Sequence, residues 1–560
     1  MTTRFAVLAA LAFLTGCGVR PGDAPADLVF RGGAVHTVDD ALPTAEAVAV
    51  RSGRIVYVGD AAGVETWIGE GTEVVDLQGR MLLPAFHDTH VHPVSGGIEL
   101  GECDLNPATD RADVVRIVSA CAATVEPGGW LRGGGFQLPI FPDGAPGREL
   151  LDSLAPDVPA FLASADGHSA WVNSRALALA GVDAGTADPP PDGVIVRRED
   201  GEPQGTLRES AMGLVSRLVP AHTDEEVLAG LMRGVEMASR LGITTLHEAS
   251  ADESYLKAYA EAERRGLLTT RVVVSIRVDG DRGTAQVPDM VAARDRYQGR
   301  LVRPVAAKIF LDGVIEGGTA ALLEPYLDRP EWRGELTMAP DTLDAVVAAL
   351  DDAGFKVHVH AIGDRAIRTA LDAFEFQRAR DGGAGPRHVM AHIQLFDPAD
   401  VPRFAELGVV ASFQPLWSYA DTYITDLTEP RLGPVRSRWL YPIRSLVESG
   451  AVVAAGSDWS VSSMDPLPAM EVAVTRRDPD LDTGTPWIPE ERVGLETILR
   501  AYTLGGAVAA DLEEETGSIT VGKSADLVVL DRDLFSIPPE RISDAKVEMT
   551  VFEGRVVYRR

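Results

Sequence analysis

The sequence predicts an α/β protein with three parts: a (β/α)8 TIM-like barrel, a small β-sandwich formed from both chain ends, and a large insertion after the first barrel strand. Three observations lead to this prediction. Eight apolar, strand-like runs alternate with helical patterns, short strand-like runs bounded by turn signals occupy both ends, and metal-binding residue types recur near the C-terminal ends of the long runs. A closed parallel barrel carries its chemistry at that end of its strands.

The chain begins with a segment typical of export signals. Arg4 is followed by an apolar run from Phe5 to Phe13 and by Leu14-Thr-Gly-Cys17, and this run is too short to span a bilayer. Leu14 to Cys17 resemble a bacterial lipobox. This resemblance implies that residues 1–17 are a lipoprotein signal peptide, that the chain is cleaved before Cys17, and that Cys17 is lipidated. We therefore expect an exported cell-envelope lipoprotein, on the periplasmic side of the membrane or at the cell surface, that contacts the membrane only through its lipid. A disordered start or a misassigned initiation site is the alternative.

The two chain ends share one pattern. Residues 18–26 are rich in proline and glycine and are expected to form a linker. The runs within 27–80 are short and strand-like with turn signals between them, and residues 515–560 contain runs of the same character. We expect 27–80 and 515–560 to form one β-sandwich domain.

The barrel is expected to comprise residues 81–92 and 242–514. Its strands are predicted at 82–92, 243–248, 271–278, 304–312, 355–361, 388–394, 409–415 and 452–458, with helical patterns between them, for example at 341–352, 364–378 and 400–407. The segment 93–241 is far too long for one strand-to-helix connection. We expect it to be an inserted domain over the barrel mouth.

Two histidines close the first predicted barrel strand. His90 and His92 are spaced i, i+2 and therefore point to one side of a strand, and imidazole nitrogen is a preferred zinc ligand. Alone the pair is weak evidence, because paired histidines on strands are often packed or solvated. Histidines scattered over a surface would not cluster, however, and besides His87 seven of the 11 lie in or at the ends of strand-like runs: His90, His92, His247, His358, His360, His388 and His392.

Lys308 is a second unusual residue. It is one of five lysines in the chain and is flanked by Ala306, Ala307, Ile309 and Phe310. A buried ammonium is costly unless it is paired, neutralised or modified. Two interpretations remain open: a lysine whose stem is buried while its head reaches water, or a deprotonated amine that is carboxylated and bridges two cations.

Longer stretches around these residues resemble the amidohydrolase superfamily, and within it the YtcJ-like branch, which is similar to N-substituted formamide deformylases. The matching stretches run in family order along nearly the whole mature chain, at 84–92, 166–174, 242–248, 308–313, 358–366, 387–395, 456–459 and 522–527. Ala85, His87, Ser460 and the run 314–318 depart from the usual motif. These departures spare every candidate metal ligand and so bear on substrate preference.

The resemblance implies a metal site at the barrel mouth. Its ligands would be His90, His92 and Asp458 for one cation and His360 and His392 for a second, with a carboxylated Lys308 bridging two Zn²⁺ or other divalent ions. Such a pair lowers the pKa of a bound water toward ~7 and so makes hydroxide available. Asp458 would then be the catalytic general base and general acid.

Five further residues are candidates for substrate binding. His168 lies in a stretch that resembles the family, and the others lie near predicted strand ends: His247, Asp312, Trp417 and Trp459. For each of them, ordinary packing or a structural role is the alternative.

These residues together predict an enzyme that hydrolyses a C–N bond, other than a peptide bond, in a small N-substituted amide. One alternative is a lactone or phosphoester hydrolase with the same metal site, and another is a non-catalytic ligand-binding protein of the cell envelope. The sequence contains no Gly-x-Ser-x-Gly elbow or phosphate-binding loop that would compete with this interpretation.

The bulk composition excludes one class of partner. With 52 Lys and Arg against 83 Asp and Glu the net charge is −31, which opposes binding to nucleic acid or to anionic lipid. The hydrophobic share of 45% and the charged share of 24% are ordinary for a soluble globular protein, and homo-oligomer formation is compatible with them.

Cys103 and Cys121 are expected either to pair in an oxidising compartment or to remain free thiols.

Overall fold

The structure is a computed structural model that describes residues 24–190, 192–383, 385–481 and 484–560. The predicted signal segment and Cys17 lie outside these residues. Within them, no helix combines the length and the apolar character needed to cross a membrane.

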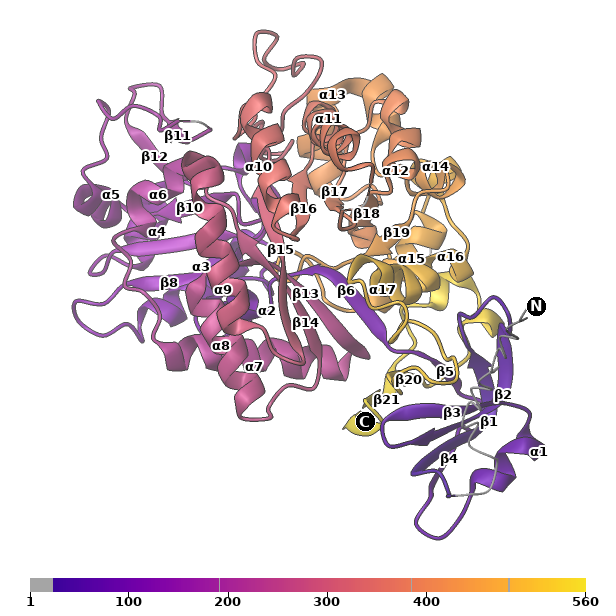
Figure 1. The fold of residues 1–560 in the computed structure, drawn as a ribbon. Coiled ribbons are helices and arrows are strands. Elements are labelled where there is room, and N and C mark those ends of the chain that lie inside the picture. The colour runs from indigo at the N-terminus through magenta and orange to yellow at the C-terminus, as the bar shows by residue number, and fades with distance from the viewer. Residues whose placement is uncertain (1–23, 191, 384, 482–483) are drawn as a thin grey trace, which may run out of the picture.

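Eight parallel strands form the barrel at the centre of the molecule (Figure 1). Neighbours follow the order β19-β18-β17-β16-β15-β14-β13-β6, and every pair in this row is parallel. The strands are β6 Phe86–Val91, β13 Ile243–Ala251, β14 Arg271–Arg277, β15 Val302–Phe310, β16 Lys356–Ala361, β17 Val389–His392, β18 Val410–Phe413 and β19 Val453–Ala455. The predicted TIM-like barrel is thus confirmed.

The barrel closes just beyond the ends of its first and last strands. The N–H of Asp458 donates to the carbonyl of His90 at 2.7 Å, and the N–H of His92 donates to the carbonyl of Trp459 at 2.8 Å. These bonds join the segment after β19 to the end of β6. They also bring two predicted metal ligands from opposite ends of the barrel sequence to one seam.

Helices cover the outside of the barrel. The longer ones are α7 Asp224–Arg240, α8 Glu253–Arg264, α9 Val287–Tyr297, α10 Pro340–Asp352, α11 Asp364–Asp381 and α15 Pro466–Thr475, and shorter ones are α12 Val401–Leu407, α14 Ile443–Glu448, α16 Leu495–Arg500 and α17 Gly506–Ala509. α7 begins with a capping box between Thr223 and Glu226. Its apolar face places Leu231 and Val235 in the barrel core, because helical periodicity puts residues i and i+4 on one side.

The first predicted strand is in fact two strands that belong to different sheets. β5 Met81–Pro84 pairs with β20 Leu527–Leu530 and β1 Leu28–His36, whereas β6 pairs with β13 in the barrel. The change occurs at Ala85, whose N–H donates to Asp526, while the N–H of Phe86 donates to Gly242. Both strands are buried along their whole length, so the apolar run 82–92 carried no signal of the break.

Strands from both chain ends form one sheet, and Figure 1 shows the indigo N-terminal strands beside the yellow C-terminal ones. Its order is β22-β21-β20-β5-β1-β2-β3, with β4 paired to β1. The strands are β1 Leu28–His36, β2 Thr44–Arg51, β3 Arg54–Gly59, β4 Glu73–Asp76, β20 Leu527–Leu530, β21 Val547–Phe552 and β22 Arg555–Arg559. Phe30, Leu82 and Leu527 meet in its own hydrophobic core.

A third sheet, β11-β12-β10-β9-β8-β7, lies within the predicted insertion. Its strands are β7 Cys103–Asp104, β8 Leu131–Phe136, β9 Ala160–Ser164, β10 Ser169–Val172, β11 Val194–Arg197 and β12 Pro203–Arg208, accompanied by α3 Arg111–Ala122, α4 Arg148–Leu154 and α5 Ser174–Ala180. Cys103 and Cys121 form a disulfide between β7 and α3.

The ends of the segment 93–241 belong to the barrel core. α2 Pro93–Glu99 packs against α7, and Val94 and Ile98 share the barrel's hydrophobic core with Leu231 of α7. The inserted domain that contains the separate sheet therefore spans fewer residues than the predicted insertion. It lies between α2 and α7 along the chain.

Candidate metal centre and active site

The six predicted metal ligands come together in the structure. They come from the C-terminal ends of β6, β15, β16 and β17 and from the segment after β19. All line one cavity of about 770 Å³, which we call the polar cavity: His90, His92, Lys308, His360, His392 and Asp458. Strand ends separated by hundreds of residues in sequence thus meet at the barrel mouth, as this fold requires of an active site.

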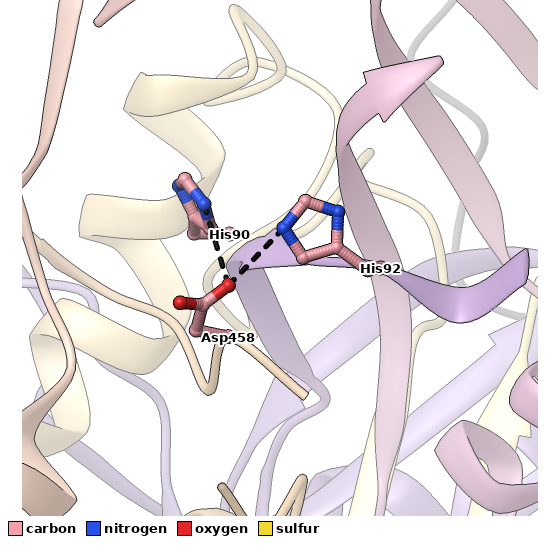
Figure 2. Close-up of side chains that lie close together, drawn as sticks. All are labelled: His90, His92 and Asp458. Carbon is pink, nitrogen blue, oxygen red and sulfur yellow. Dashed lines mark ion pairs between the residues drawn. The ribbon is translucent and has the colours of Figure 1, made fainter. Parts of the chain in front are cut away.

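His90, His92 and Asp458 form the tightest group (Figure 2). Oδ1 of Asp458 lies 3.5 Å from Nε2 of His90 and 3.2 Å from Nε2 of His92. One ligand atom from each residue lies within 4.8 Å of the others. Two imidazoles and a carboxylate at this separation are a donor set that suits zinc and similar divalent cations.

Lys308, His360 and His392 continue the site around the barrel. Nζ of Lys308 lies 3.2 Å from Nε2 of His90. The ring centroid of His392 is 4.5 Å from that of His90 and 4.5 Å from that of His360. Lys308 is completely buried, so its head does not reach water and the first interpretation of this lysine is wrong.

Three of the candidate ligands are oriented by a second buried group. Nδ1 of His90 lies 2.9 Å from Nε2 of His358, Nδ1 of His392 lies 3.0 Å from Oε1 of Gln414, and Nδ1 of His92 lies 3.5 Å from Glu248. Such partners fix the tautomer and the direction of a metal-binding imidazole.

The protonation states of His90, His392 and Asp458 favour cation binding, whereas His92 must lose a proton to bind a cation. Burial, together with the positive charge of Lys308, holds the pKa of His90 well below its ordinary value, and burial lowers the pKa of His392 to about 3. His92 differs: burial acts against its charge, but Asp458 and Glu248 raise its pKa to about 9. Burial would raise the pKa of Asp458, yet His92 and His392 hold it below its ordinary value. Neutral imidazole and ionised carboxylate are the forms that bind metals.

Two orphaned atoms show that the donor set fits a cation. Nε2 of His392 and Oδ1 of Asp458 are buried and have no hydrogen-bond partner. A buried polar atom without a partner is destabilising. Because the other ring nitrogen of His392 is already bonded to Gln414, its free nitrogen is available to a cation, and a cation at Oδ1 would likewise satisfy Asp458.

His168 reaches the site from the inserted sheet. Its ring centroid lies 5.3 Å from that of His360, and its Nδ1 lies 2.8 Å from Oε2 of Glu209. Glu209 is held in turn by Thr319, whose hydroxyl donates to Oε1 at 2.6 Å. Burial opposes the charge of the imidazole, but Glu209 raises the pKa of His168 to about 9.

The structure separates the remaining substrate-binding candidates. Trp417 stacks on His392 with a centroid distance of 5.8 Å and an interplanar angle of 5°, and it lines a second cavity. Asp312 lines the polar cavity, but its carboxylate accepts backbone N–H groups from Ala321, Ile362 and Gly363. Asp312 therefore stabilises the loop after β15 through these backbone hydrogen bonds.

His247 and Trp459 are corrections to the sequence prediction, because neither lines the polar cavity or the second cavity. Nε2 of His247 lies 3.1 Å from Oγ of Ser275, which also bonds His358, so His247 lies beneath the ligands. The ring of Trp459 lies against Gly96, where an added Cβ would be only 2.7 Å from it. Its direction is set by helix packing, which the sequence did not reveal.

Sequence reasoning missed two functional carboxylates. Glu248 directly follows His247 in a strand that is buried almost throughout, and a buried acid at such a position is itself a signal, because ionised groups are rarely buried without a partner. Glu209 gave no such signal. It meets His168 only through the pairing of β10 with β12.

The comparisons with known proteins agree with this geometry. The sequence profile of the amidohydrolase family matches residues 73–558. The chain belongs to the amidohydrolase family.

Three relatives cover nearly the whole chain. It is 32% identical to the protein LONG AFTER FAR-RED 3 of Arabidopsis thaliana, over 96% of this chain and 92% of that one. It is 30% identical to the putative amidohydrolase YtcJ of Bacillus subtilis (strain 168), over 95% and 99%. It is 28% identical to the N-substituted formamide deformylase of Arthrobacter pascens, over 95% and 98%. The YtcJ-like resemblance is thereby confirmed.

A solved structure supports the same assignment. An uncharacterised metal-dependent hydrolase from Pyrococcus furiosus superposes with a TM-score of 0.69 at 27% identity, over 90% of this chain and 99% of that one. This amidohydrolase is therefore a metal-dependent hydrolase.

We predict that the contact between His358 and His90 sustains metal affinity. In His358→Asn the partner of His90 Nδ1 is lost, and metal affinity should fall by roughly 10- to 100-fold, as measured by competition with a chromogenic chelator. His388→Asn is the matched control, because His388 is also a buried histidine but bonds the backbone of Val357. Equal affinities in the two variants would contradict the prediction.

Proposed function

We propose that this amidohydrolase hydrolyses the C–N bond of a small N-substituted amide. The observation that carries the proposal is the meeting of six potential ligands, with two buried orphaned atoms among them, at the mouth of one barrel. The likeness to the N-substituted formamide deformylase over 95% of the chain supports an amide over an ester or a phosphoester.

The donor set supports a centre for two divalent cations, with zinc as the preferred ion. His90, His92 and Asp458 would hold one cation, and His360 and His392 the second. Bound cations would supply Lewis-acid polarisation and would lower the pKa of a water molecule.

Lys308 is suited to bridge the two positions as a carbamate. Burial lowers its pKa to about 7, against the opposing charges of Asp458 and Glu248. The neutral amine can therefore add to carbon dioxide: a C–N bond forms, the amine proton is released, and a carboxylate replaces the ammonium. This exchange would remove a buried cation that lies only 3.2 Å from His90.

Asp458 is placed to move the proton. Its Oδ1 faces the imidazoles of His90 and His92 at ion-pair distance and makes no hydrogen bond. We propose that this oxygen accepts the proton of the attacking water and then transfers it to the leaving nitrogen.

His168 is placed to bind the substrate carbonyl. Its Nδ1 is engaged by Glu209, while the residue lines the cavity that holds the ligands. A donor fixed in this way would stabilise charge that develops on the carbonyl oxygen.

Turnover of an amide panel tests the proposal. Metal-loaded protein should hydrolyse formamides and acetamides with alkyl or aryl N-substituents, and Asp458→Asn should lower kcat by about 10²- to 10⁴-fold while amide binding, measured by calorimetry, is retained. Asp281→Asn removes a carboxylate from the rim of the same cavity and is the matched control, with kcat expected to stay within about twofold. Hydrolysis of lactones or phosphoesters in place of every amide would refute the proposal.

The lysine carbamate has its own test. Metal reconstitution of the stripped protein should restore more activity and more bound metal with bicarbonate than in bicarbonate-free buffer, because the carbamate carbon comes from dissolved carbon dioxide. Lys308→Ala should bind less metal and show no bicarbonate response. The same response in Lys308→Ala and in the wild type would exclude this role.

We also propose export and lipidation at Cys17. The disulfide between Cys103 and Cys121 supports an oxidising compartment, and the lipobox-like sequence supports acylation. The mature protein should show by mass spectrometry a lipid-modified N-terminal Cys17, and Cys17→Ser should abolish both the modification and partition into detergent. An unmodified, uncleaved N-terminus in the wild type would disprove lipidation.

A further inference from the structure

A second cavity of about 260 Å³ adjoins the metal centre. We call it the aromatic pocket, because Trp417, Tyr419, Tyr423 and Tyr441 all contribute to its wall. A dry cavity of about 150 Å³ is enough for a benzene ring, so the aromatic pocket can take one substantial arm of a substrate.

The aromatic pocket and the polar cavity meet at the reacting groups. Both are lined by Asp166, His168, His360, His392, Asp458 and Val461. If the proposed function holds, the scissile bond lies at these shared side chains. One arm of the amide then lies in the polar cavity and the other in the aromatic pocket.

Two carboxylates in the wall of the aromatic pocket are used by no catalytic step. Glu316 is 9% exposed and accepts hydrogen bonds through Oε1 from Gln394 at 2.9 Å and Thr428 at 2.6 Å. Asp421 accepts the N–H of Ile424 at 2.9 Å. All of these donors are neutral, so the hydrogen bonds leave the two negative charges uncompensated.

Among the described residues of the lining, the one cationic side chain, His168, is already paired with Glu209. Neither a lysine nor an arginine lines the aromatic pocket within the described residues. Arg476 lies behind the wall and directs its guanidinium at the backbone carbonyls of Ser418 and Tyr441. Burial, reinforced by Glu316, raises the pKa of Asp421 to about 6, which is the response of a carboxyl group that lacks a nearby positive partner.

We propose that the aromatic pocket selects substrates whose N-substituent carries a positive charge, as an alkylated or protonated amine. Aromatic faces and buried carboxylates together are the features that recognise ammonium groups, through cation–π attraction and direct charge pairing. An anionic substituent would meet two like charges, and a neutral one would leave both carboxylates without a positively charged partner. The net charge of −31 would also draw cations toward the protein.

A pair of isosteric formamides tests this inference. One is the formamide of (trimethylammonio)ethylamine, and the other carries a tert-butyl group in place of the trimethylammonium, so the two differ in charge and hardly in shape. We expect the cationic probe to have a kcat/KM about tenfold higher in metal-loaded protein and to bind metal-free protein about tenfold more tightly by calorimetry.

Two variants locate the effect. Glu316→Gln and Asp421→Asn keep a hydrogen-bond acceptor but lose the charge, and each should bring the ratio between the two probes toward one. If one of these variants fails to fold, the other still tests the inference. Asp372→Asn is the matched control, because it removes a carboxylate from the exposed surface of α11, and it should leave the ratio as in the wild type.

The outcomes separate this inference from the proposed function. Equal or better hydrolysis and binding of the neutral probe would overturn the inference and leave amide hydrolysis standing. If neither probe is hydrolysed but the cation still binds more tightly to the wild type than to Glu316→Gln, the aromatic pocket selects cations and the proposed reaction fails. A wild-type ratio that persists in both pocket variants would also overturn the inference.

Discussion

The active site depends on how the barrel closes. The bonds from Asp458 N–H to His90 and from His92 N–H to Trp459 hold the last strand's extension against the end of the first strand. Because they fix the backbone on both sides of the seam, they set the distance between the Asp458 carboxylate and the two imidazoles. Asp458 itself has a φ of +54°, which is unfavourable for a residue with a Cβ. The closed seam, together with the bonds from Ser457 to Asp88, holds it there.

Burial then determines the chemistry of the groups that the seam brings together. It removes water from His90, His392 and Lys308, so that the histidines are neutral and the lysine loses its proton more readily. The imidazoles of His90 and His392 are prevented from turning away, because His358 and Gln414 contact their second ring nitrogens. The result is a set of donors that is formed before any cation arrives, which lowers the ordering cost of binding.

The sequence predicted the barrel because strands depend on local patterns, and its resemblance to the amidohydrolase superfamily implied the six candidate ligands. Apolar runs mark the strands, and rare residue types such as Lys308 stand out within them. It failed where the answer depends on packing between distant elements. The break at Ala85 lies inside a uniformly buried run. The partner of His168, Glu209, is 41 residues away and directly follows β12, which pairs with β10. Trp459 follows Asp458 directly, yet it turns toward Gly96 because α2 leaves space there.

The candidate metal ligands and the rest of the cavity walls come from different parts of the chain. The barrel strands supply the ligands, whereas His168 and Asp166 come from the inserted sheet and the aromatic wall comes from loops after β18. These two outer parts are joined, since the hydroxyl of Tyr423 bonds Gln137 at 3.0 Å and Leu427 packs into the core of the insertion. A substrate arm in the aromatic pocket therefore contacts both at once, and a change in either part alters the fit without moving a ligand. Relatives with the same barrel can differ in substrate for this reason.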